Sequence, residues 1–158
     1  MLKSTVNGIR ALLDEQRVLA LAVDLDGVPY AGLLPFAVLP DRSGLLVNAS
    51  KLARHSQGLS AGARAGVLIH EQDGPDKNPM QIERLTFECV VHPLERDSAE
   101  WEKQRDGFLE KFPKSRLTFK MRDFTLYRLT FRQGLYVAGF GQAIDIEPGD
   151  IAALAGAG

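Results

Sequence analysis

GVPYAGLLPFAV, residues 27–38, is the stretch that decides the fold class of this chain. As a strand it carries apolar residues on both faces, whereas most surface strands have one polar face. Such a strand fits a small barrel, in which one face fills the interior and the other must be covered. The cover is either a second copy of the chain or a helix at the N-terminus. Pro35 cannot donate to a strand ladder, so we expect an edge or a bulge there.

Alternating and helical patterns place further elements around this stretch. We expect strands over 18–25, 28–39, 45–48, 64–71, from about 84 onward, 124–131 and 135–138, the last two forming a hairpin across 132–134. Helices are expected over 5–16, over 51–59, and from a capping box at Asp97 and Glu100 to about 112. Residues 72–81 read as a loop, and residues 148–158 as a short helix with a frayed end. This is a mainly β (α+β) pattern, typical of an antiparallel barrel of six to seven strands with flanking helices.

The bulk composition narrows the class of protein. The chain has 158 residues and one cysteine, and its 20 acidic and 19 basic residues give a net charge of -1. We expect a single domain over 1–158, no disulfide framework and no broad surface for nucleic acid. Charged residues are scattered through the N-terminal segment, so neither a signal peptide nor a spanning helix is expected there. The sequence therefore predicts a cytoplasmic protein with no membrane partner.

A second stretch, NASKLARHSQGL (residues 48–59), suggests an anion site. Ser50 suits a helix N-cap, and Lys51, Arg54 and His55 would then share one face of the helix. Cations oppose the helix dipole at this end, at a cost of about 0.3–1 kcal/mol each, and a bound phosphate would reverse that sign. A solvated basic face explains the same pattern, and the spacing alone leaves both readings open.

Sequence motifs for catalysis are absent. The chain contains no CxxC, HExxH, P-loop or G-x-S-x-G pattern, so no metal site and no catalytic residue is predicted. Arg84 and Thr86 share a strand face, where a ligand contact and a cross-strand ion pair are both open. The glycines of YVAGFG (residues 136–141) permit close backbone approach, either to a ligand or to a neighbouring strand.

The order of these segments resembles a known family. From about Arg17 to Leu94, GVPYAGLLPFAV, NASKLARHSQGL, ARAGVLIHE and IERLTFECVVHPL resemble the pyridoxamine 5'-phosphate oxidase-like, FMN-binding split-barrel superfamily. DFTLYRLTFRQGLYVAGFGQA resembles the branch that contains the haem-utilisation proteins. The resemblance implies a split barrel and a homodimer, with FMN at the subunit interface.

The resemblance also implies which residues bind the cofactor. In the family, the FMN phosphate meets basic and hydroxyl side chains of a strand-to-helix segment, which corresponds here to residues 48–55. The second half of the site corresponds to the bulged strand from Tyr30 to Phe36, and the partner subunit contributes from the strand that contains Arg84, Leu85 and Thr86. The implied cofactor-binding residues are Asn48, Ser50, Lys51, Arg54, His55, Tyr30, Gly32, Leu34, Arg84 and Thr86.

This chain departs from the family pattern in two places. The true oxidases have an arginine and a lysine where this chain has Gly32 and Ala37, and their C-terminal arginine and histidine motif is missing. Pyridoxamine phosphate oxidation is therefore not expected. The haem-handling branch carries a histidine ligand in a C-terminal tail or domain, whereas no histidine follows His92 here.

Three functions remain open, in this order. The first is an FMN-dependent oxidoreductase acting on an unknown small molecule, in which the flavin carries the redox chemistry. The second is a haem-binding or haem-degrading protein, with His55, His70, His92, Cys89 or a tyrosine as the axial ligand. The third is a cofactor-free split barrel that serves as a binding module.

Overall fold

Seven strands form one antiparallel sheet, and six of them close into a barrel. The computed structural model describes residues 1–139 and 141–156. The strands are β1 (Val18–Leu25), β2 (Val28–Val38), β3 (Gly44–Ser50), β4 (Arg64–His70), β5 (Arg84–Pro93), β6 (Phe124–Gly139) and β7 (Gln142–Ile146). Their order is β3-β2-β1-β4-β5-β6-β7, and β3 also pairs with β6, which closes the barrel and leaves β7 as an extra strand. The predicted fold class is confirmed.

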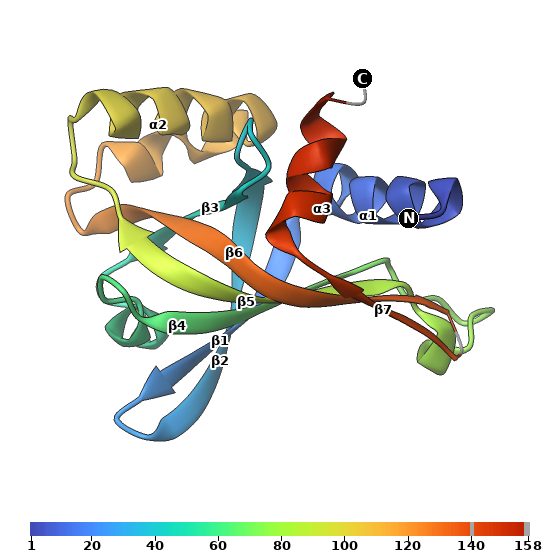
Figure 1. Cartoon of the computed structure of the whole chain (residues 1–158). Helices are drawn as coiled ribbons and strands as arrows, with labels where there is room; N and C mark the ends of the chain where they lie inside the picture. The colour runs from blue at the N-terminus through green and yellow to red at the C-terminus, as the bar shows by residue number, and fades with distance from the viewer. Residues whose placement is uncertain (140, 157–158) are drawn as a thin grey trace.

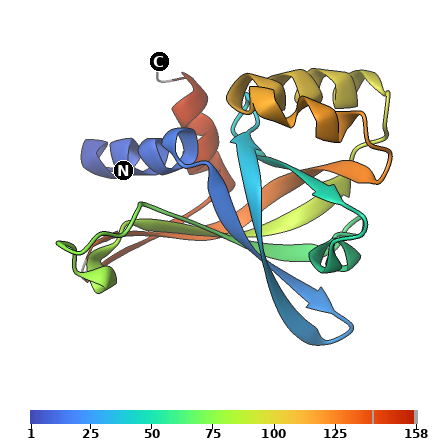
Figure 2. The same ribbon diagram turned by 180° about the vertical axis from the view of Figure 1, so that it is seen from behind.

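Helices cover one end of the barrel. They are α1 (Lys3–Glu15), α2 (Ala99–Lys111) and α3 (Pro148–Ala152), with short 3₁₀ helices η1 (Arg54–Gly58), η2 (Pro79–Gln81), η3 (Pro113–Phe119) and η4 (Ala153–Gly156). All three α-helices lie at the same end, and the β1–β2 hairpin projects from the opposite end (Figure 1 and Figure 2). No helix among the described residues is long and apolar enough to span a bilayer.

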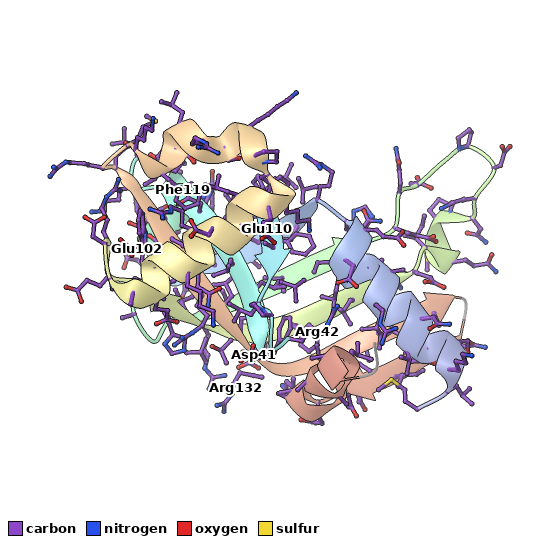
Figure 3. The ribbon with its side chains drawn as sticks, turned by 90° about the horizontal axis from the view of Figure 1, so that it is seen from above. Asp41, Arg42, Glu102, Glu110, Phe119 and Arg132 are labelled. Atoms are coloured by element: carbon purple, nitrogen blue, oxygen red, sulfur yellow. The ribbon has the colours of Figure 1, made fainter. Side chains whose placement is uncertain are left out.

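The apolar side chains form two clusters. The barrel interior is filled by alternate residues of its strands, including Leu85, Phe87 and Cys89 of β5, and α1 seals its end with Ile9 and Leu13. A smaller cluster lies under α2 and η3, which run side by side when the molecule is seen from above (Figure 3). Because α1 packs into the interior cluster, it does not cover the outer face of β2.

That outer face is open in the single chain. Leu33 is 67% exposed, and Pro29, Ala31 and Pro35, which alternate along the same face, are exposed as well. The explanation that the N-terminal helix covers the outer face of this strand is therefore wrong. Cover by a second copy stays a prediction.

The predicted hairpin across residues 132–134 is wrong, because β6 runs without interruption from Phe124 to Gly139. Gly134 is a packing glycine and not a turn glycine: a Cβ there would lie 2.5 Å from the Phe87 ring. The chain reverses after Gly139, and both Gly139 and Gly141 have positive φ. Phe140, between them, lies outside the described residues.

The predicted helix over 51–59 is reduced to η1, which begins only at Arg54. Ser50 does not cap it, because Ser50 is the last residue of β3 and pairs with Phe124 of β6. The Lys51 N–H then donates to the Asp123 carbonyl (2.6 Å), and the Leu52 N–H donates to Ser50 Oγ (3.1 Å). These bonds make residues 51–53 a turn.

Three smaller expectations also change. The β1–β2 ladder has no bulge at Pro35. Instead, β2 changes its partner strand at this point: Pro35 pairs with Val18 of β1, and the next residue, Phe36, pairs with Val47 of β3. The N-cap of α2 is Ser98 and not Asp97. The C-terminal segment packs against the barrel as far as η4, because Ile151 of α3 and Leu154 of η4 are buried in the core cluster. Residues 157 and 158 lie outside the described part.

Candidate functional site

The candidate site is the region where η1 and the turn before it lie against β2, defined here by Tyr30, Gly32, Lys51, Arg54 and His55. Gly32 faces the His55 ring, and a Cβ on Gly32 would lie only 2.9 Å from His55 Nδ1. The absence of a side chain on β2 therefore makes the room that the imidazole occupies. This pairing brings together two of the residues predicted to bind the cofactor.

His55 is the most unusual polar group of the site. Its Nε2 atom is buried and has no hydrogen-bond partner among the described residues. Burial lowers the pKa of this imidazole below its usual value of 6.5. The ring is therefore neutral at pH 7, which is the form that binds metals. A buried nitrogen without a partner is costly, so this atom is a strong candidate for contact with a bound group.

Two cations precede the histidine in the chain. Arg54 and Lys51 are exposed, and neither forms an ion pair within residues 1–139 and 141–156. The Arg54 guanidinium lies over the Tyr30 ring, with 5.9 Å from its Cζ to the ring centroid. Such an arrangement can hold an anionic group on the cations while offering a flat aromatic surface beside it.

Asn48 and Ser50 already have partners inside the chain. The Asn48 amide donates to Thr118 Oγ1 (3.0 Å), and the Ser50 hydroxyl donates to a carboxylate oxygen of Asp123 (2.8 Å). These bonds tie β3 to η3 and to the start of β6. A carboxylate bonded to Ser50 repels a phosphate at this position. Leu34 packs in the barrel core.

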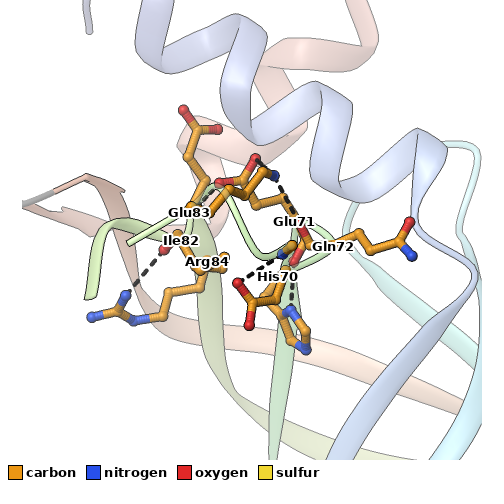
Figure 4. A network of polar contacts seen from close by, with 9 residues as sticks. His70, Glu71, Gln72, Ile82, Glu83 and Arg84 are labelled. Atoms are coloured by element: carbon orange, nitrogen blue, oxygen red, sulfur yellow. Dashed lines mark hydrogen bonds and ion pairs between the residues drawn. The ribbon is translucent and has the colours of Figure 1, made fainter. Parts of the chain in front are cut away.

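Arg84 and Thr86 lie apart from the other predicted residues. They are on β5, and β1 and β4 separate them from β2. The Arg84 guanidinium donates to the Ile82 carbonyl (3.0 Å), next to a polar network in which Glu71 accepts from the Glu83 N–H (3.0 Å) (Figure 4). Thr86 is exposed on the outer sheet face. One chain alone therefore does not bring the two halves of the predicted site together.

Asp123 belongs to the site, although no sequence pattern directly indicates it as a site residue. Its carboxylate accepts from Ser50 and its carbonyl accepts from Lys51, so it sets the turn that carries the cations. The available signal was its place before Phe124, in the DFTLYR motif that carries the resemblance.

The other candidate iron ligands fit less well than His55. Cys89 is fully buried in the barrel, and burial raises the pKa of its thiol to about 12. The His70 ring is exposed, with its Nδ1 atom 2.6 Å from the Glu71 carbonyl. His92 lines a separate polar cavity with Asp41, Glu100, Lys103 and Arg128, and none of the residues that define the candidate site lines this cavity. Tyr127 and Tyr136 are buried.

Comparisons with known proteins give consistent matches. The family model described as pyridoxamine 5'-phosphate oxidase matches residues 7–138. Among characterised proteins, the chain is 33% identical over 146 residues to the haem oxygenase HutZ of Vibrio cholerae, a match that covers 90% of this chain and 81% of that protein.

Solved structures agree with these matches. The structure of Vibrio cholerae HutZ, described there as a haem storage protein, has a TM-score of 0.73 at 28% identity, covering 80% of this chain and 89% of that chain. A haem-binding protein from Mycobacterium smegmatis has a TM-score of 0.83 at 21% identity, and the match covers 97% of this chain and 62% of that longer chain. At that identity the second likeness concerns the fold alone.

Proposed function

This chain belongs to the pyridoxamine 5'-phosphate oxidase family, in its haem-utilisation branch, and on that premise we propose that it binds haem as a haem-degrading protein. The observation that carries the proposal is the 33% identity to a haem oxygenase over 90% of this chain. The sequence patterns alone favour FMN over haem, and the likeness to a haem oxygenase reverses that order.

The residues of the candidate site fit haem. Haem carries two carboxylates at one edge, and Lys51 and Arg54 are two exposed cations that lie close together in the chain. His55 supplies a neutral imidazole whose Nε2 atom lacks a partner among the described residues. Since this atom is enclosed, ligation of iron requires a shift of η1, a short element that follows a turn.

The roles of the residues follow from this chemistry. Lys51 and Arg54 bind the carboxylates and so orient the porphyrin edge. His55 stays neutral and can donate its lone pair, and Tyr30 with Arg54 offers a flat surface for stacking. When bound, haem supplies the iron at which dioxygen is activated.

A titration with haemin, followed through the Soret band, tests the proposal. We expect saturable binding by the wild type, and affinity about 10-fold or more lower for Lys51→Gln/Arg54→Gln, because two charge-assisted bonds are lost. The wild type should prefer haemin over its dimethyl ester, and the double variant should not. Lys3→Gln/Arg132→Gln, which removes two exposed cations elsewhere, is the matched control.

His55 is tested separately in the same assay. His55→Ala should shift the Soret band if the imidazole ligates iron, and an unchanged band would exclude that role. Absence of haem binding by the wild type, together with tight uptake of FMN, would return the flavin function to first place. That function has lost two of its supports, since Ser50 faces a carboxylate and no α-helix begins behind it.

We also propose that the chain acts as a homodimer through the outer face of its sheet. The register aligns Leu33, Ala20, Leu68, Thr86 and Leu135 across five strands, which makes a mostly apolar row. A cavity of about 480 Å³ lies in the same surface, between small residues such as Ala22 and Gly66. A second copy on this face would supply the Arg84 and Thr86 that one chain keeps away from β2.

A further inference from the structure

The segment KFPKSRLTFKMR, residues 111–122, contains five basic residues and no acidic one, although the whole chain has a net charge of -1. Lys111 is turned inward, where its ammonium donates to the Gln16 carbonyl (2.6 Å). The other four cations, Lys114, Arg116, Lys120 and Arg122, are exposed. None of them forms an ion pair within the described part of the chain. The positive charge on this surface is therefore not neutralised locally by ion pairs.

The geometry of η3 arranges these residues. A 3₁₀ helix has three residues per turn, so Lys114 and Leu117 lie on one edge, and Lys120, just beyond the helix, continues it. Leu117 is 68% exposed between the two lysines, and Met121 is 41% exposed next to them. We call this set, with Arg116 and Arg122, the basic edge.

The inner side of the same segment is held firmly. Phe119 packs against the Trp101 ring, with 6.1 Å between ring centroids, and lies between η3 and α2 (Figure 3). Arg96 donates to the carbonyls of Phe119 (2.5 Å) and Met121 (3.1 Å). The exposed leucine and methionine are thus presented on an anchored element and not on a loose loop.

We propose that the basic edge attaches the protein reversibly to an anionic lipid surface. Cations around exposed apolar side chains are the combination that binds anionic bilayers, through headgroup attraction and shallow insertion. Two apolar tips are too small for a stable protein interface, which needs about 800 Å² from each partner. Two acidic residues of α2, Asp106 and Glu110, line a cavity together with Arg116 and Lys120, and Asp106 is paired with Arg105. Asp123, which follows Arg122 in the chain, accepts a hydrogen bond from Ser50.

This proposal does not depend on haem binding. The expectation of no membrane partner rests on the lack of a spanning segment, and a surface contact needs none. Attachment through the basic edge would also bring the candidate site near the lipid. The Lys51 N–H donates a hydrogen bond to the carbonyl of Asp123, which follows Arg122 in the chain.

Co-sedimentation with lipid vesicles tests the proposal on the intact chain. The wild type should bind vesicles of phosphatidylglycerol and phosphatidylcholine at a ratio of about 3 to 7, and should not bind pure phosphatidylcholine. Binding should fall steeply between about 0.05 M and 0.5 M salt, because salt screens the cations. Lys114→Gln/Leu117→Ser/Lys120→Gln should lower the partition coefficient by roughly 25-fold from its two lost cations alone.

The matched control is Lys3→Gln/Met80→Ser/Arg132→Gln, which removes the same classes of exposed side chain from other elements. It should bind as the wild type does, and both variants should keep the thermal midpoint of the wild type. Equal binding by the two variants, or no binding to anionic vesicles at low salt, would overturn the proposal. Retention on immobilised polyglutamate without vesicle binding would assign the basic edge to an acidic protein and overturn it equally.

Discussion

Cys89 shows how a barrel interior controls the chemistry of one side chain. Its thiol is fully buried on β5, and burial raises its pKa from 9.0 to about 12. At neutral pH the folded chain therefore contains almost no thiolate, which is the reactive form. We expect a thiol reagent such as DTNB to label the protein only as fast as it unfolds, and urea to accelerate the labelling. Rapid labelling of the native protein at pH 8 would contradict this burial.

Because of this raised pKa, the free energy of unfolding depends on pH in the alkaline range. Above about pH 9 the unfolded thiol loses a proton that the folded thiol retains until about pH 12. The unfolded state then binds fewer protons, so the free energy of unfolding falls as the pH rises through this window. Urea unfolding at pH 8 and at pH 10 measures the effect, and Cys89→Ala should show a smaller loss.

Gly134 is a second residue whose role is set by packing. A Cβ there would lie 2.5 Å from the Phe87 ring and 2.7 Å from the Thr86 carbonyl oxygen. We expect Gly134→Ala to reduce the free energy of unfolding by about 1–3 kcal/mol, since the backbone of β5 cannot move away freely. The urea midpoint measures this loss.

Gly107 provides the control for that substitution. It lies inside α2, and a Cβ there would meet no atom within 4 Å. Gly107→Ala should stabilise the protein by up to about 1 kcal/mol, because alanine is the better helix former. Equal midpoints for the two variants would mean that Gly134 does not pack as described.

At the scale of elements, the start of α2 distinguishes two possible caps. The Ser98 hydroxyl accepts from the Trp101 N–H (3.2 Å), whereas Asp97 has a positive φ of 65°. Ser98→Ala should cost about 1 kcal/mol of stability, as loss of an N-cap does. Asp97→Gly should cost nothing or stabilise slightly, because glycine adopts this backbone conformation without strain. The reverse ranking in thermal unfolding would restore Asp97 as the cap.

The strands could be predicted from the sequence where the information is local. The alternation of Leu85, Phe87, Cys89 and Val91 predicts one buried face, and all four are buried. The Asp26-Gly27 turn and both bounds of β1 follow from equally local patterns.

The errors arose where contacts between distant segments decide the structure. Gly134 reads as a turn residue, but a contact with β5 fixes its role. Ser50 reads as a helix cap, but pairing with Phe124 keeps it in a strand. The closeness of Gly32 and His55 joins two separate segments, so the sequence could suggest both residues and not their contact.

At the scale of the whole molecule, the proposed dimer gives a direct test. Leu33 is 67% exposed at one end of the apolar row, and a carboxylate there cannot be buried in an apolar interface without a large cost. We expect the wild type to have the mass of a dimer in size-exclusion chromatography with light scattering, and Leu33→Glu to have that of a monomer. Haem affinity should fall with it if the second copy supplies Arg84 and Thr86 to the site, as proposed.

Met80→Glu is the control, since Met80 is 64% exposed on η2 and is not part of the row. It should remain dimeric. A monomeric wild type would contradict the proposed dimer. The haem titration would then still test whether the single chain binds haem.

The closure of the barrel by β3 and β6 also governs how the chain can fold during synthesis. Gly44 pairs with Thr130, so the second edge of β3 has no hydrogen-bonding partner until almost the whole chain has been synthesised. Until β6 leaves the ribosome, β3 and β5 both present open edges, to which other nascent chains can add. Pairings so distant along the chain form slowly. A pause in translation between β5 and β6 therefore prolongs the time during which the protein most needs a chaperone.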